Sequence, residues 1–111
     1  MISSEKLVLT PIEGANPNQD VYLLQGPVTL SNLLTIQEAF QSRGPVLILD
    51  LAGVPYVDSA GVGAIVQAVV SRKKQGRRLV LTAPNETVRK LFHLTQVDSL
   101  LETYPTLAEV K

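Results

Sequence analysis

The chain has 111 residues, and its ten Lys and Arg are balanced by ten Asp and Glu. That length suits one domain, and the 45% hydrophobic and 18% charged residues are typical of a folded chain rather than a disordered one. Zero net charge gives no reason to expect nucleic acid as a partner, and the absence of Cys excludes disulfides and zinc-thiolate sites. No apolar run approaches the ~20 residues of a membrane span. We therefore expect one cytoplasmic domain over residues 1–111, with no direct membrane insertion.

The beginning of the chain predicts a pair of strands followed by a helix. Residues 7–12 and 21–25 are short and rich in branched side chains, and turn-forming residues separate them, which predicts a hairpin-like pair. Residues 29–42 carry apolar side chains near the helical period, and Thr29 or Ser31 is placed to cap the start of this helix. The expected apolar positions are Leu30, Leu33, Leu34, Ile36 and Phe40.

The rest of the chain alternates predicted strands and helices. The expected elements are a doubly buried strand at 46–51, a helix from 59 to about 75, a strand at 78–82, a helix at 86–94 capped by Asn85 and a short strand near 100–104. Such alternation predicts an α/β domain with a mixed, mostly parallel sheet of roughly four or five strands and about four helices.

The helix after Asp58 has one apolar side and one small, uncharged side. At ~100° per residue, the apolar side holds Val62, Ile65, Val66, Val69 and Val70. The opposite side holds Ala60, Ala64, Gln67 and Ser71, with Gly63 and Ala68 at its borders. A solvated helix would usually place Lys and Glu there, whereas small side chains allow another surface to approach closely. Either this side packs beneath another part of the domain, or it is a docking face for a partner protein.

Ser59 lies where the predicted strand gives way to this helix. Asp58 or Ser59 can serve simply as the helix N-cap. Alternatively, Ser59 is a phosphoacceptor, because the positive end of the helix would accept the added −1.5 to −2 charges at roughly neutral pH with little damage to the fold. Gly61 and Gly63 each cost a helix ~1 kcal/mol relative to Ala. Close packing on the sheet or close approach by a partner could favour them.

The stretch Val57-Asp58-Ser59-Ala60-Gly61-Val62-Gly63-Ala64-Ile65 resembles the signature of the STAS domain (sulfate transporter and anti-sigma factor antagonist). The resemblance extends over roughly residues 5 to 110. It includes the strand before the motif, at 49–54, and the later segments 78–82, 85–94, 97–101 and 107–109 in the same order.

The resemblance implies a regulatory protein rather than an enzyme. Stand-alone bacterial members are anti-sigma factor antagonists, which bind an anti-sigma factor that is also an ATP-using serine kinase. That kinase phosphorylates the serine matching Ser59, the complex dissociates, and a PP2C-type phosphatase resets the switch. The ATP is bound by the partner, so no cofactor or metal is expected in this chain. The residues expected to contact the partner are Asp58, Ala60, Gly61, Gly63, Ala64 and Gln67.

The chain departs from the family pattern in one loop. Many antagonists carry Gly-Glu-Leu-Asp after the second strand, where this chain has Gly26-Pro27-Val28-Thr29. In the family this loop lies beside the phosphorylation site and helps to contact the partner. The missing acids favour an alternative function, in which the chain is an accessory STAS subunit of a membrane transport or lipid-trafficking complex without a phosphorylation cycle. The intact Asp58-Ser59-Ala60-Gly61 favours the antagonist.

Overall fold

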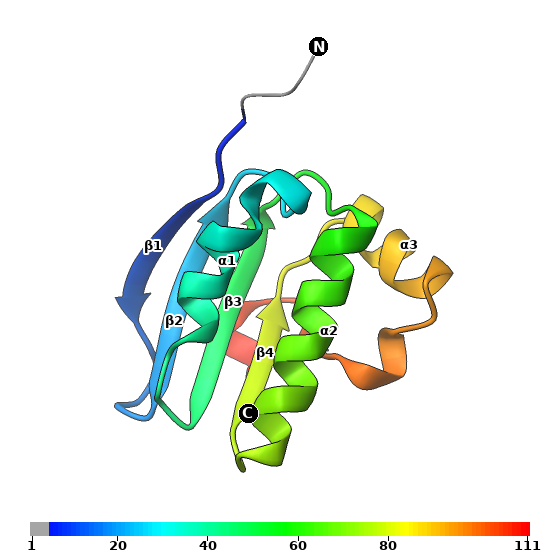
Figure 1. Ribbon diagram of the computed structural model, residues 1–111. Helices are drawn as coiled ribbons and strands as arrows, with labels where there is room; N and C mark the ends of the chain where they lie inside the picture. Colours follow the sequence, from blue (N-terminus) through cyan, green and yellow to red (C-terminus); the bar gives the residue numbers. More distant parts are fainter. Residues whose placement is uncertain (1–4) are drawn as a thin grey trace.

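Five strands form one mixed sheet in the computed structural model, which describes residues 5–111 (Figure 1). The first four residues of the expected 1–111 domain lie outside the described residues. The strands are β1 Val8–Glu13, β2 Gln19–Gln25, β3 Val46–Gly53, β4 Arg78–Thr82 and β5 Glu102–Tyr104. Their order across the sheet is β1-β2-β3-β4-β5; β1 is antiparallel to β2, and all later pairs are parallel. The predicted mixed, mostly parallel sheet is confirmed.

Three α-helices connect the parallel strands and lie on one face of the sheet. They are α1 Leu33–Phe40, α2 Ser59–Lys74 and α3 Glu86–Leu94, and three 3-10 turns accompany them: η1 Leu30–Asn32, η2 Asp98–Leu100 and η3 Leu107–Glu109. Strands that pair in sequence order through right-handed crossovers place every connecting helix on the same side. Figure 1 shows α1 and α2 in front of the sheet. The expectation of about four helices is thus close, with three α-helices and short 3-10 turns.

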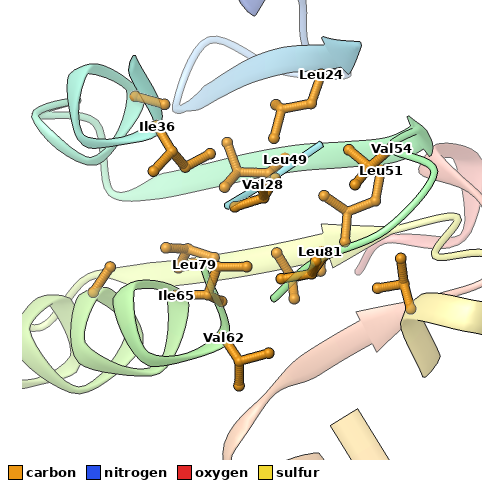
Figure 2. Packing of buried hydrophobic residues seen from close by; sticks show 14 of the residues in the cluster. Leu24, Val28, Ile36, Leu49, Leu51, Val54, Val62, Ile65, Leu79 and Leu81 are labelled. Atoms are coloured by element: carbon orange, nitrogen blue, oxygen red, sulfur yellow. The ribbon is translucent and has the colours of Figure 1, made fainter. Parts of the chain in front are cut away.

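The core has a thick layer beneath the helices and a thin one on the opposite face. Ile36 of α1 and Ile65 of α2 join the same buried cluster as Leu49 and Leu81 of the sheet (Figure 2). Phe92 of α3 belongs to this cluster too. The opposite face buries Val21, Val46, Ile48 and Val80, against which the partly buried Ile12, Tyr104, Leu107 and Val110 pack. Strand β3 contributes to both layers, so its predicted burial on both faces is confirmed.

The predicted start and apolar face of the first helix are partly wrong. The segment begins with the 3-10 turn η1, and α1 starts at Leu33. A 3-10 turn has about three residues per turn, so it shifts the side chains before α1 out of the α-helical phase. Leu30, in this turn, is 68% exposed. Leu34 is 82% exposed for another reason: it lies two residues, or ~200°, from the fully buried Ile36 and so on the opposite side of α1. Thr29 makes no capping bond; its hydroxyl contacts the Ser31 hydroxyl instead.

The buried side of α2 is also rotated from its predicted position. Its buried residues are Gly61, Val62, Ile65, Ala68 and Arg72. Val70, expected in the core, is 41% exposed, whereas Ala68 is buried. The cause is that α2 packs against both β4 and α1, so its inner side turns toward α1 and away from Val70.

Candidate functional site

The loop after β2 and the loop after β3 are joined just before α2 begins. Val28 and Val57 form an isolated parallel bridge. The Val28 amide donates to the Tyr56 carbonyl at 3.2 Å, and the Asp58 amide donates to the Val28 carbonyl at 3.2 Å. The segment in which this chain departs from the family pattern is therefore fixed against the N-terminus of α2.

Asp58 is the N-cap of α2 and also holds η1 in place. Its Oδ1 accepts a hydrogen bond from the Gly61 amide at 2.8 Å, and its Oδ2 accepts one from the Leu30 amide at 3.0 Å. Of the two candidate capping residues, the structure assigns the cap to Asp58 and not to Ser59. Both carboxylate oxygens are thus used by the chain's own backbone.

Ser59 is exposed on the first turn of α2. A helix leaves its first four amides without intrahelical acceptors. Here the Asp58 amide bonds to Val28 and the Gly61 amide bonds to Asp58. The amides of Ser59 and Ala60 have no acceptor within residues 5–111. A hydroxyl, two available amides and the positive helix end therefore coincide at the surface.

The two glycines of the motif have opposite surroundings. A Cβ on Gly61 would lie 2.1 Å from the Val28 carbonyl oxygen and 2.8 Å from Cγ1 of Val57. A Cβ on Gly63 would meet nothing within 4 Å. Gly61 is thus required by packing within the chain and is buried, while Gly63 faces outward. Of the two explanations for these glycines, close packing applies to Gly61.

The small, uncharged side of α2 remains mostly open. Gly63, Gln67 and Ser71 are exposed, and Ala60 and Ala64 are half-buried. Only Ala68, expected at the border, is buried within the domain. We call Ser59, Ala60, Gly63, Ala64 and Gln67 the outer face of α2.

Sequence reasoning missed one apolar residue beside this face. Leu30 was expected on the apolar side of the predicted helix, yet its side chain is 68% exposed. Its amide is bonded to Asp58, so the residue lies next to the start of α2. The tertiary bond that places it there has no counterpart in the local sequence pattern.

Two kinds of site are absent from the part of the chain that the structure describes. No three His, Cys, Asp or Glu side chains gather there as a metal ion would require. Across the same residues, every helix is too short or too polar to cross a lipid bilayer.

Comparison with known proteins identifies one family over most of the chain. The STAS domain family matches residues 15–110. The anti-sigma-B factor antagonist of Listeria monocytogenes is 35% identical over 66 residues, which is 59% of this chain and 58% of that protein. The chain spans little more than half the length of the curated relatives that it matches, this one included.

Solved structures share the fold at lower identity. An anti-sigma factor antagonist from Mycobacterium paratuberculosis matches with a TM-score of 0.75 and 18% identity, covering 93% of this chain and 89% of that one. The phosphorylated form of the Bacillus cell fate determinant SpoIIAA matches with a TM-score of 0.62 and 19% identity, covering 88% and 92%. At these identities the two structures support the fold alone.

Proposed function

Because the chain belongs to the STAS domain family, we propose that it is an anti-sigma factor antagonist switched by phosphorylation of Ser59. In the unmodified form it binds an anti-sigma factor that is also a serine kinase. The kinase transfers a phosphate from its own bound ATP to Ser59, and the complex dissociates. A PP2C-type phosphatase removes the phosphate. The similarity to the Listeria anti-sigma-B factor antagonist supports this assignment.

The observation that carries the proposal is the exposed Ser59 hydroxyl at the edge of the uncharged outer face of α2. A phosphate there adds about −1.5 to −2 charges at neutral pH. The positive end of the helix and the amides of Ser59 and Ala60 can accommodate this charge within the folded chain. The phosphate instead weakens binding, because a partner that docks on the outer face has to bury the added charge.

The loop that lacks the family's acids still supports the site. Val28 is fully buried and holds Tyr56 and Asp58 through its backbone. Asn32 Nδ2 donates to the Pro27 carbonyl at 2.9 Å, which fixes the loop from its other side. The acids at this loop are therefore not needed to position Ser59, and their absence bears on the choice of partner.

Phosphorylation is tested with the cognate serine kinase and ATP, followed by mass spectrometry of the peptides. We expect one phosphate at Ser59 and none in Ser59→Ala. The chain supplies a matched internal control, because Asp98-Ser99 repeats the Asp-Ser pair at an exposed position in η2. A phosphate at Ser99, or none with any serine kinase of the source cell, would contradict the proposal.

The effect on binding is tested with Ser59→Asp and the control Ser99→Asp. We expect Ser59→Asp to weaken binding to the kinase at least tenfold, and Ser99→Asp to leave it unchanged. Both variants should unfold within about 1 kcal/mol of wild type in urea, because both positions are exposed. Equal binding by Ser59→Asp and wild type would favour the accessory-subunit function without a phosphorylation cycle.

A further inference from the structure

A groove of about 570 Å³ lies between the C-terminal halves of α1 and α2. Its size is within the range of about 300–1,000 Å³ typical of small-molecule sites. Three arginines line it, Arg43, Arg72 and Arg77, together with glutamine and serine side chains. No acidic side chain is among the lining residues.

Arg72 lies at the floor of this groove, and only 4% of its surface is exposed. Its Nη1 donates to the Ser42 carbonyl at 2.7 Å, its Nη2 to the Gly44 carbonyl at 2.9 Å and its Nε to the Arg78 carbonyl at 3.3 Å. All three acceptors are neutral. The guanidinium is therefore anchored by hydrogen bonds, but no carboxylate is bonded to it.

Of the two charged groups that act on the pKa of Arg72, the like charge of Arg77 has the larger effect and the opposite charge of Asp20 the smaller. Burial lowers the pKa of its guanidinium, and the positive charge of Arg77 lowers it further, while Asp20 acts in the opposite direction. The Asp20 carboxylate is itself bonded to the Ser42 hydroxyl and to the Gly44 amide. An anion in the groove would relieve the repulsion between the two guanidinium groups.

Arg43 and Arg77 stand at the rim with their charges available. Arg43 is exposed, and Arg77 makes one side-chain bond, to Oε1 of Gln75 at 3.3 Å. Neither forms a salt bridge with a carboxylate within residues 5–111. The guanidinium groups of Arg43 and Arg77 are not needed to cap α2 either, because the backbone amides of Gly76 and Arg77 bond to its last carbonyls.

We propose that this groove binds a small phosphate-bearing molecule. Guanidinium groups match phosphate oxygens with paired N–H donors, and partial burial strengthens such bonds. The amide and hydroxyl side chains of the lining supply further donors. Ala64 and Gln67 belong both to the groove and to the outer face of α2, so a bound phosphate would lie beside the proposed partner surface.

The test is a titration of the isotope-labelled full chain with sodium pyrophosphate, followed by NMR amide shifts. Sodium chloride at the same ionic strength is the reference. We expect saturable shifts concentrated in the groove lining. The variant Arg43→Gln/Arg77→Gln should bind pyrophosphate at least tenfold more weakly. Arg72 is left unchanged because of its structural bonds.

The matched control is Arg89→Gln/Lys90→Gln, which removes two charges from exposed positions of α3. It should bind pyrophosphate as wild type does. Shifts identical to those in chloride, shifts centred away from the groove, or equal affinity in the Arg43→Gln/Arg77→Gln variant would overturn the proposal. No kinase is needed and Ser59 is not altered, so this test stands apart from that of the proposed function.

Discussion

Each end of α2 is held by one ionisable side chain that bonds to the backbone, but the surfaces beside the two ends differ in charge. At the first end, Asp58 binds two backbone amides with its two carboxylate oxygens. At the last end, Arg72 binds three backbone carbonyls with its guanidinium nitrogens. Beside Asp58 the exposed residue is the uncharged Ser59, whereas beside Arg72 the rim carries two further arginines.

This difference indicates where a change of charge can act as a signal. The outer face of α2 is uncharged, so about two negative charges added at Ser59 would change its electrostatic potential strongly. The groove at the last end of α2 already carries the positive charges of three arginines. An anion there would bind as a ligand that neutralises this charge, rather than create a new charge on an uncharged surface. Four substitutions in α2 and its cap test how each end is built, from the largest expected effect to the smallest.

Gly61→Ala should destabilise the fold most. The new methyl group would lie 2.1 Å from the Val28 carbonyl oxygen, which belongs to a fixed backbone. We expect the free energy of unfolding to fall by about 3 kcal/mol, since overpacking against backbone exceeds the gain in helix propensity. Urea unfolding followed by circular dichroism measures the loss. A variant as stable as wild type would mean that the bridge between the two loops yields easily.

Arg72→Met keeps an unbranched side chain that can replace the apolar stem of arginine, but it removes the guanidinium and its three hydrogen bonds. We expect a loss of about 2 kcal/mol in urea, because three carbonyl groups lose a charged donor. Lys73→Met, at the next and exposed position, is the matched control and should change stability by less than about 0.5 kcal/mol. Equal effects of the two substitutions would show that the buried guanidinium adds nothing to stability.

Asp58→Ala removes the cap of α2 and the bond to η1 together. We expect stability to fall by about 1–2 kcal/mol, the usual cost of losing an N-cap. Hydrogen exchange should increase at the Gly61 and Leu30 amides, which lose their acceptor. Glu38→Ala is a suitable control, because Glu38 is exposed on α1 and its carboxylate makes no hydrogen bond within residues 5–111. Unchanged exchange at both amides would contradict the described geometry.

Gly63→Ala should have the smallest effect on stability, and in the opposite direction. The added methyl group meets nothing within 4 Å, so helix propensity alone should stabilise the fold by about 0.5–1 kcal/mol. The same substitution should weaken binding to the proposed partner, because it adds bulk to the outer face. Stabilisation without any change in binding would remove Gly63 from the partner surface.

Periodicity and capping residues were enough to predict most of the fold. The strand at 78–82 and the helix at 86–94 have the predicted bounds, and Asn85 accepts the capping bond from the Val88 amide at 2.8 Å. These features depend on local patterns, in which each residue type acts on neighbours a few positions away. The turn that carries Asp58 and Ser59 was predicted for the same reason.

What the sequence did not reveal depends on contacts between distant segments. Leu34 is apolar, but α1 turns Ile36 and Ala39 toward the core, which leaves Leu34 on the opposite side in solvent. Arg72 looks like a surface residue at a helix end, yet the carbonyls of the loop after α1 draw it inward. The amide of Leu30 meets Asp58 across 28 positions of the chain. No local pattern encodes these pairings.

The fixed backbone around Asp58 has a consequence for response time. Val28 and Asp58 hold the start of α2 through several hydrogen bonds, so the unmodified hydroxyl is already displayed to an incoming enzyme. The proposed switch at Ser59 then needs no slow rearrangement of this chain before the phosphate is added or removed. The rate of switching would be set by the turnover of the proposed kinase and phosphatase and by the lifetime of the complex between the chain and the kinase.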